Sequence, residues 1–198
     1  GLHPSPDILG SLEQLGQALG QAAGVLLLGP AGSGKTACLH SLYKIQNRLV
    51  AMEDAAAQSC RPVQIAHLYP SVLSPQEFLG WLEGPCWHHG VFPRLLGEAS
   101  RYRTAGPEGQ VQESAGIQRW IVCDGAPSAA WLDCVTCLLG DPPQLSLPSG
   151  ERIARPPGTF LLMEVGDATG MSPTAVGRCA LVWCGGEQTW QGRLGVLM

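Results

Sequence analysis

The sequence has 198 residues, of which 45% are hydrophobic and only 14% are charged, with a formal net charge of −4. This length and hydrophobic content favour one packed globular domain over a disordered chain. The acidic balance argues against a nucleic-acid or membrane-surface binder, and no hydrophobic run reaches the roughly 20 residues that cross a bilayer.

Helical and strand-like segments alternate from the start of the chain. Ser5-Pro6-Asp7 predicts a helix start, because Ser caps a helix and Pro suits its first position. Hydrophobic residues then recur at helical spacing as far as Leu19. Val25–Leu28 is wholly hydrophobic, as expected of a strand buried on both faces. A glycine-rich loop, an amphipathic helix and a second predicted strand, Val63–Leu68, follow.

The second half continues this alternation, and residues 104–116 have the composition of a surface loop. We expect helices opening at Ser74 and covering Val91–Arg101, Ala129–Leu139 and Pro173–Arg178, strands at Trp120–Cys123, Phe160–Val165 and Ala180–Trp183, and a hairpin over Leu145–Ile153. Together these segments predict an α/β fold, with a five-stranded parallel sheet, helices on both faces and a β-hairpin insertion. Ligands bind such sheets at the carboxyl ends of the strands.

Eight cysteines are scattered through hydrophobic segments, which favours buried thiols in a reducing compartment over a disulfide framework. Two clusters are alternatives as zinc ligands. One is the pair Cys134 and Cys137, and the other is Cys86 with His88 and His89. Neither cluster has a second half at the usual spacing of zinc ligands, so buried thiols are the preferred interpretation.

A phosphate-binding loop is the strongest motif. Gly29-Pro30-Ala31-Gly32-Ser33-Gly34-Lys35-Thr36 matches the pattern G-x-x-x-x-G-K-[ST] in full. Glycines let main-chain N–H groups approach phosphate oxygens, and the following helix adds the positive end of its dipole. Lys35 is expected to bind the β- and γ-phosphates of ATP, and the Thr36 hydroxyl to bind Mg²⁺. A glycine turn without a ligand is the alternative, but the flanking strand and helix favour the nucleotide site.

The strand ending at Asp124 is typical of a Walker B strand, whose acid helps to hold Mg²⁺; an ordinary Asp at a turn is the alternative. ATPases of the AAA+ type usually place a Glu next, to activate the attacking water, but this chain has Gly125. Since a positioned base contributes roughly 10²–10⁴ in rate, we expect a site that binds ATP and hydrolyses it poorly. Glu164 ends the next predicted strand and is a candidate substitute base, with a paired acid as the alternative.

Four segments, in this order, resemble the second AAA+ module of dynein heavy chains: the phosphate loop, Trp120–Gly125, Ser149–Ile153 and Ser172–Cys179. The family's counterparts of the last three read Trp-Ile-x-Phe-Asp-Gly-Pro, Asn-Gly-Glu-Arg-Ile and Ser-Pro-Ala-Thr-Val-Ser-Arg-Cys-Gly. Leu68–Pro70 and Trp87–Phe92 also resemble this family, so the resemblance spans nearly the whole chain. Ser149 and Gly177 depart from the family's Asn and Ser, as in a divergent heavy chain of the dynein heavy chain domain-containing type.

The resemblance implies that residues 1–198 are a single AAA+ large α/β subdomain, a fragment of a longer chain that ends before a helical lid. It implies the second position in a ring of six modules, and ATP held without efficient hydrolysis. Arg178 matches an arginine finger that reaches the preceding module's nucleotide, with pairing to an acid such as Asp167 as the alternative. Arg152 and Arg155, on the predicted hairpin, are expected to be surface or interface charges.

The implied partners are neighbouring AAA+ modules and, through the parent protein, dynein light and intermediate chains and microtubules. The implied location is the cytoplasm and cytoskeleton, or a ciliary or flagellar axoneme. Two other functions stay open. One is an active ATPase that uses Glu164, and the other is a scaffold that keeps the fold without binding nucleotide.

Overall fold

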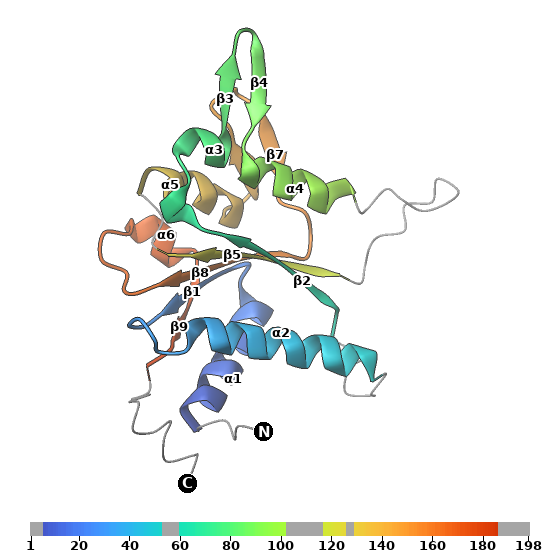
Figure 1. Ribbon diagram of the computed structural model, residues 1–198, viewed down its shortest axis with the longest axis vertical. Helices are drawn as coiled ribbons and strands as arrows, with labels where there is room; N and C mark the ends of the chain where they lie inside the picture. The colour runs from blue at the N-terminus through green and yellow to red at the C-terminus, as the bar shows by residue number, and fades with distance from the viewer. Residues whose placement is uncertain (1–5, 53–59, 102–116, 126–128, 186–198) are drawn as a thin grey trace.

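The structure is a computed structural model that describes residues 6–52, 60–101, 117–125 and 129–185. Helices and strands alternate along this chain (Figure 1), in the order α1 (Pro6–Gln21), β1 (Gly24–Leu28), α2 (Lys35–Ala51), β2 (Val63–Leu68), η2 (Pro70–Val72), α3 (Pro75–Leu79), β3 (Gly80–Glu83), β4 (Cys86–His89), α4 (Val91–Arg101), β5 (Gln118–Asp124), α5 (Ala129–Thr136), η3 (Cys137–Leu139), β6 (Gln144–Ser146), β7 (Arg152–Ala154), β8 (Thr159–Val165), α6 (Pro173–Gly177) and β9 (Ala180–Trp183). The predicted cap Ser5 and the predicted loop 104–116 lie outside the described residues.

Five parallel strands form the central sheet, in the order β2-β5-β8-β1-β9. The predicted α/β fold with a five-stranded parallel sheet is therefore confirmed. Strand β1 is buried from Gly24 to Leu27, as expected for a strand covered on both faces. Strand β8 lies between β1 and β5, so Glu164 has Leu27 as its neighbour on one side and Asp124 on the other. This order places several predicted site residues at one edge.

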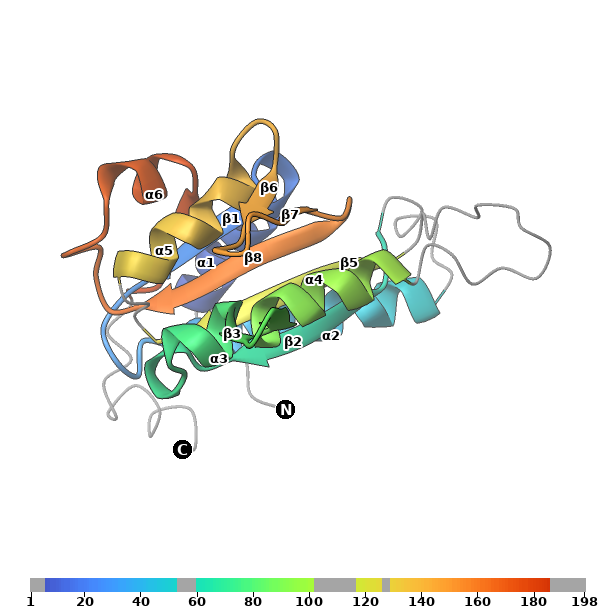
Figure 2. The same cartoon turned by 90° about the horizontal axis from the view of Figure 1, so that it is seen from above.

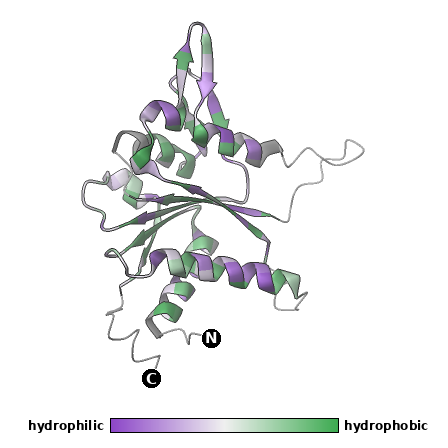
Figure 3. Cartoon of the chain, viewed as in Figure 1, coloured by the Kyte–Doolittle hydropathy of each residue, from purple (hydrophilic) through white to green (hydrophobic). Residues whose placement is uncertain are grey.

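Helices cover both faces of the sheet, as the views in Figures 1 and 2 show. Helices α1 and α2 pack on one face around a core that includes Leu15, Leu39 and Trp120. Helices α3 to α6 lie over the other face, where the rings of Phe78 and Phe92 stack with centroids 4.9 Å apart. Hydrophobic and hydrophilic stretches alternate along α2 (Figure 3), as expected for a helix with one buried side.

Two antiparallel hairpins stand outside the central sheet. The hairpin β6–β7 pairs Leu145 with Ile153 and confirms the predicted insertion. The hairpin β3–β4, which projects at the top of Figure 1, was missed by sequence analysis. Its strands have four residues each, too few for a hydrophobic period to be distinguished. The ring nitrogen Nε2 of His89 lies 2.7 Å from Oε2 of Glu151, which links the two hairpins.

Arg155 holds the end of β7 to the rest of the fold. Its Nε donates a hydrogen bond to the carbonyl oxygen of Leu138 at 3.1 Å, and its Nη1 donates to that of Thr159 at 2.8 Å. Burial lowers the pKa of the guanidinium. Arg155 is therefore not a free surface charge, because its half-buried side chain folds back over η3 and β8. Arg152 is exposed.

Replacing Arg155 with alanine would leave two main-chain carbonyls without this donor. We expect the free energy of unfolding to fall by about 2 kcal/mol, since hydrogen bonds from charged donors are stronger than average. Urea denaturation followed by circular dichroism would measure the loss. Arg152→Ala, from the exposed end of the same hairpin, is the matched control and should change stability by less than about 0.5 kcal/mol. Equal losses in the two variants would contradict the role of Arg155.

Candidate functional site

The loop between β1 and α2 follows a path that requires glycine. Gly29 has a φ of +151°, and a Cβ atom there would lie 2.2 Å from the carbonyl oxygen of Cys184. Gly32 and Gly34 also have positive φ angles, of +80° and +91°. Residues with a side chain rarely adopt such φ angles, so the backbone path of this loop requires glycine at these three positions.

The first turn of α2 faces this loop with its main-chain N–H groups. Gly34 is the N-cap in a left-handed conformation, and in the described chain it has no side-chain capping bond and no acidic residue in the turn that follows. The first N–H groups of any α-helix lack intrahelical acceptors. Their partial positive charge, reinforced by the helix dipole, therefore suits an anion such as a phosphate group.

The ammonium group of Lys35 lies across the loop. Its Nζ donates to the carbonyl oxygens of Gly29 at 2.6 Å and Pro30 at 2.9 Å. The hydroxyl oxygen of Ser33 is buried and has no hydrogen-bond partner among the described residues. A cation, N–H donors and an unpaired hydroxyl thus converge on one short loop, which is a donor set that fits phosphate oxygens.

Oxygen ligands gather beside the loop at the carboxyl ends of β5 and β8. The Thr36 hydroxyl donates to Oε2 of Glu164 at 2.5 Å. Glu164 is only 3% exposed, and its Oε1 has no hydrogen-bond partner in the described part of the chain. Asp124 is exposed and lies next to Glu164 in the sheet register. Two carboxyl groups and a hydroxyl are the ligand types that Mg²⁺ prefers, so this group fits a magnesium ion.

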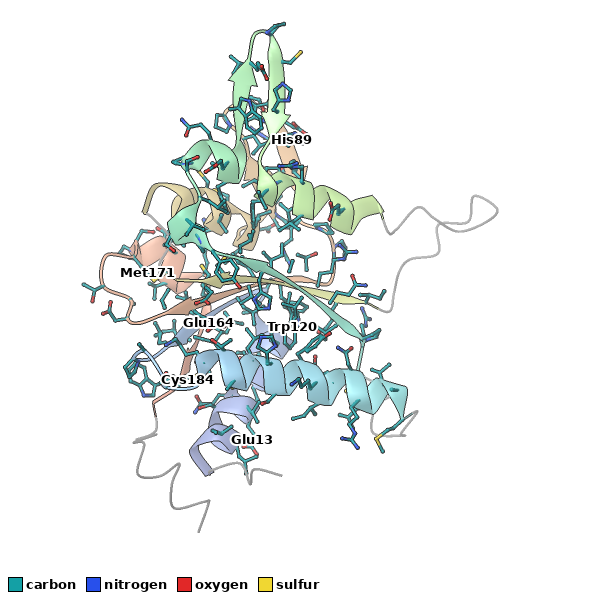
Figure 4. All side chains as sticks on the ribbon, in the orientation of Figure 1. Glu13, His89, Trp120, Glu164, Met171 and Cys184 are labelled. Carbon is teal, nitrogen blue, oxygen red and sulfur yellow. The ribbon has the colours of Figure 1, made fainter. Side chains whose placement is uncertain are left out.

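Sequence analysis treated Thr36 and Asp124 as one pair and Glu164 as a separate candidate base. The fold brings all three side chains to one edge, because β8 lies between β1 and β5. Burial raises the pKa of Glu164; the Thr36 hydrogen bond opposes this rise and the Asp124 carboxylate adds to it. Figure 4 places Glu164 near the loop end of α2.

The raised pKa of Glu164 gives a direction for the pH dependence of stability. The folded chain holds this proton more tightly than the unfolded chain, whose ordinary glutamate pKa is 4.5. The stabilising contribution is therefore complete below that value, and it is lost as the pH rises through the raised folded pKa. A glutamine cannot ionise and still accepts the Thr36 hydrogen bond. We expect Glu164→Gln, without nucleotide, to lose less stability than wild type as the pH rises above the ordinary glutamate pKa of 4.5.

Urea denaturation at several pH values would measure this difference. Glu13→Gln is the matched control, because Glu13 lies on the exposed side of α1 and its variant should keep the wild-type pH dependence. A Glu164→Gln curve parallel to wild type would contradict the expected proton uptake at this carboxyl group.

Gly125 and Arg178 occupy positions that matter for hydrolysis. Gly125 follows Asp124 with a φ of +103° and carries no side chain that could activate water. Arg178 caps the end of α6, and its Nη1 donates to the carbonyl oxygen of Thr136 at 3.0 Å. Asp167, the local acid considered as its partner, instead accepts a hydrogen bond from the Thr169 N–H at 2.8 Å. Arg178 is thus held by a main-chain carbonyl of α5.

The cysteine predictions are only partly confirmed. Cys38, Cys123 and Cys184 are buried, but Cys86 and Cys137 are exposed, so the prediction of buried thiols is wrong for those two. Cys86 lies on the projecting hairpin, and Cys137 in a short 3-10 turn. Within the described residues, no group of three His, Cys, Asp or Glu side chains is placed to hold a metal ion. None of the described helices is both long enough and hydrophobic enough for a bilayer span.

Cys184, directly after the predicted strand Ala180–Trp183, also lies beside the loop, and the sequence did not indicate this position. Its main-chain N–H donates to the Leu28 carbonyl at 2.7 Å, and its own carbonyl packs against Gly29. Its thiol is hydrogen-bonded to that of Cys38, and this bond lowers the pKa of Cys184. Burial opposes the shift, and the Lys35 cation assists it. Cys184 meets the loop because β9 pairs with β1, and no local sequence pattern indicates that pairing.

Similarity to known proteins extends over the entire chain. It is 71% identical over 198 residues to dynein heavy chain domain-containing protein 1 of Homo sapiens, and 61% identical over 198 residues to the Mus musculus protein of that name. Over 162 residues, 81% of the chain, it is 30% identical to the dynein-1-beta heavy chain, flagellar inner arm I1 complex, of Chlamydomonas reinhardtii. The chain spans 4%, 4% and 3% of these relatives' lengths. No protein-family model matches it.

Proposed function

This chain is related over its whole length to dynein heavy chain domain-containing protein 1 and over 81% of its length to a cytoplasmic dynein heavy chain, and on that basis we propose that it is an ATP-binding AAA+ module of a dynein-type heavy chain. In this proposal the module is an AAA+ large α/β subdomain, most like the second module of the ring. Mg²⁺ and ATP are its ligands, with a structural or regulatory role and poor hydrolysis.

The observation that carries the proposal is the donor set of the loop at residues 29–36. The N–H groups at the start of α2 and the Lys35 ammonium supply positive charge where a triphosphate would lie. Thr36 and Asp124 would hold Mg²⁺, which neutralises phosphate charge when bound. Glu164, placed between β1 and β5, orients the Thr36 hydroxyl. The sheet brings Thr36, Asp124 and Glu164 to one edge, and on binding Lys35 would turn from the Gly29 and Pro30 carbonyls to the phosphates.

Weak hydrolysis follows in this proposal from Gly125. A general base must lie within hydrogen-bond reach of the attacking water, and Gly125 offers no side chain. Glu164 is the candidate substitute base for an active ATPase, which is the second function considered. Its Oε2 already accepts the Thr36 hydrogen bond, and its raised pKa reduces the ionised fraction that a base needs. These two features favour binding over turnover, although the unpartnered Oε1 keeps Glu164 a candidate.

The nucleotide that copurifies with the chain tests the proposal. The protein would be purified in the presence of Mg²⁺ without added nucleotide, denatured with acid, and the extract separated by ion-exchange chromatography. Bound ATP supports a binding module with poor hydrolysis. Bound ADP would favour the active ATPase, and steady phosphate release lost in Glu164→Gln would identify its base. A chain without nucleotide that also fails to bind added Mg-ATP would favour a scaffold.

Arg178 is proposed to act on the nucleotide of the preceding module. A guanidinium at the transferring phosphate supplies about 10³–10⁵ in rate, so we expect Arg178→Ala to lower hydrolysis by that neighbour at least about 100-fold in a complex of both modules. Binding of Mg-ATP by the present chain should be unaffected. Arg152→Ala, an exposed arginine on β7, is the control. Unchanged hydrolysis in Arg178→Ala would contradict the arginine-finger role and leave Arg178 with a structural hydrogen bond to the Thr136 carbonyl.

The role of the whole protein forms part of the proposal. Neighbouring AAA+ modules are its direct partners, and microtubules with dynein light and intermediate chains are partners of the parent protein in microtubule-based movement. Relatives carry the names cytoplasmic dynein, axonemal dynein and flagellar inner-arm dynein. The proposed location is therefore the cytoplasm and cytoskeleton, including a ciliary or flagellar axoneme.

A further inference from the structure

Two cysteine thiols meet behind the phosphate-binding loop. Cys38 lies in the first turns of α2, and Cys184 directly follows β9. Both side chains are 2% exposed, they belong to one hydrophobic cluster, and their thiols are hydrogen-bonded to each other. They are separated by most of the sequence, so this contact is created by the pairing of β9 with β1. None of the roles proposed above uses either thiol.

The pair spans the two segments that hold the loop. The Cys184 N–H donates to the carbonyl of Leu28, the last residue of β1, and the Cys184 carbonyl lies against Gly29. On the other side, the Cys38 N–H donates to the carbonyl of Gly34, the N-cap of α2, at 2.8 Å. The main chains of the two cysteines thus hold Leu28, directly before the loop, and Gly34, its sixth residue, so any covalent link between their sulfurs would act on the loop.

We propose that Cys38 and Cys184 form a redox modification site, at which hydrogen peroxide joins the two thiols in a disulfide that ties the start of α2 to the end of β9. The hydrogen bond with the Cys38 thiol and, after it, the charge of Lys35 lower the pKa of Cys184, which supports this choice of attacking sulfur. The burial of the pair restricts the reaction to small oxidants.

The reaction balances with one peroxide. The Cys184 thiolate attacks one peroxide oxygen and breaks the O–O bond, which gives Cys184 sulfenic acid and a hydroxide ion. The sulfur of Cys38 then attacks the Cys184 sulfur and displaces a second hydroxide, forming the S–S bond. The protons of the two original thiols convert both hydroxides to water. The sulfurs lose two electrons and the peroxide gains them.

The disulfide should alter the loop because an S–S bond of about 2.05 Å is shorter than any contact between two thiols. Closing that gap draws the first turn of α2 toward β9 and shifts the N–H groups that face the loop. Displacements near 1 Å in a preorganised site have large effects, so we expect the disulfide to weaken Mg-ATP binding about tenfold. This consequence rests on the proposed nucleotide binding, whereas formation of the disulfide does not.

Peptide mapping of the folded, fully reduced 198-residue chain tests the disulfide directly. The chain would be treated with a small excess of hydrogen peroxide, its remaining thiols alkylated, and the digest analysed by mass spectrometry without reduction. We expect a linked peptide containing Cys38 and Cys184 that dithiothreitol separates. In Cys38→Ser, the sulfenic acid on Cys184 should instead be trapped by dimedone. Cys123→Ser removes another buried thiol, on β5, and should leave the Cys38–Cys184 link unchanged.

Peptide mapping of the wild-type chain tests whether the disulfide forms, even if a variant fails to fold. Recovery of Cys38 and Cys184 as alkylated thiols while exposed Cys86 is oxidised would overturn the site, and so would a link from either to another cysteine. Titration of Mg-ATP into the oxidised and the reduced chain then tests the effect on the loop. Equal affinities would overturn that effect. A reduced chain that binds no Mg-ATP would refute the proposed function while the map still decides the disulfide.

Discussion

Replacing Lys35 with alanine is expected to weaken Mg-ATP binding at least about 100-fold, since each charge-assisted hydrogen bond contributes about 1.5–3 kcal/mol. The Lys35 ammonium lies over the loop, 2.6 Å from the Gly29 carbonyl oxygen and 2.9 Å from that of Pro30. Two carbonyl acceptors hold a cation less strongly than a triphosphate does, so the side chain can turn to the β- and γ-phosphates. Isothermal titration calorimetry with Mg-ATP would measure the loss.

Lys44→Ala is the matched control for this experiment. Lys44 lies on the exposed side of the same helix, two and a half turns further along, so its variant removes the same charge without touching the loop. It should bind Mg-ATP within about twofold of wild type, because exposed distant charges are largely screened. Similar affinities for wild type and Lys35→Ala would refute the nucleotide site.

Gly29→Ala should be the most destabilising single methyl addition in the loop. The new Cβ would lie 2.2 Å from the Cys184 carbonyl oxygen, and the φ of +151° disfavours any side chain. The clashing atom is main chain, and the N–H of the same residue donates to the Leu28 carbonyl, so Cys184 cannot move away without disturbing the end of the β1–β9 pairing. We expect the free energy of unfolding to fall by about 3–5 kcal/mol, a large share of the stability of an ordinary domain.

Urea denaturation of Gly29→Ala and Gly10→Ala would test this expectation. Gly10 lies inside α1, and a Cβ atom there meets nothing within 4 Å. Because alanine is a better helix former than glycine, Gly10→Ala should raise stability by about 0.5–1 kcal/mol. If Gly29→Ala costs less than about 1 kcal/mol, β9 does not close over the loop as described here.

The elements that sequence analysis located correctly depend on neighbouring residues. Val25–Leu28 is hydrophobic at every position because both faces of the sheet are covered, and the loop at residues 29–36 needs glycine where its φ is positive. The hairpin β6–β7 has its turn residues within five positions of one another. Where residues close in sequence are sufficient to select a conformation, the sequence predicts that conformation correctly.

The features that the sequence did not predict are not set by a local residue pattern. The strands β3 and β4 are too short to show a hydrophobic period, and Arg155, expected at the surface or an interface, is half-buried and hydrogen-bonded to the carbonyls of Leu138 and Thr159. The exposure of Cys86 and Cys137 depends on which side of a hairpin or a 3-10 turn they occupy. The short hairpin gives too few residues for a pattern, and the positions of Arg155 and the two thiols depend on how the chain packs; residue type alone reveals neither.

By itself, then, the sequence determined the phosphate-loop motif, the α/β class and the absence of a side chain after Asp124, since each is a property of consecutive residues. Only the tertiary structure decided that Glu164 accepts the Thr36 hydroxyl and that Cys184 meets Cys38. Both contacts arise from the strand order, which places β8 and β9 on either side of β1. That order is selected by burial of hydrophobic surface between segments far apart in the sequence, so the spacing of residues within one segment does not predict it.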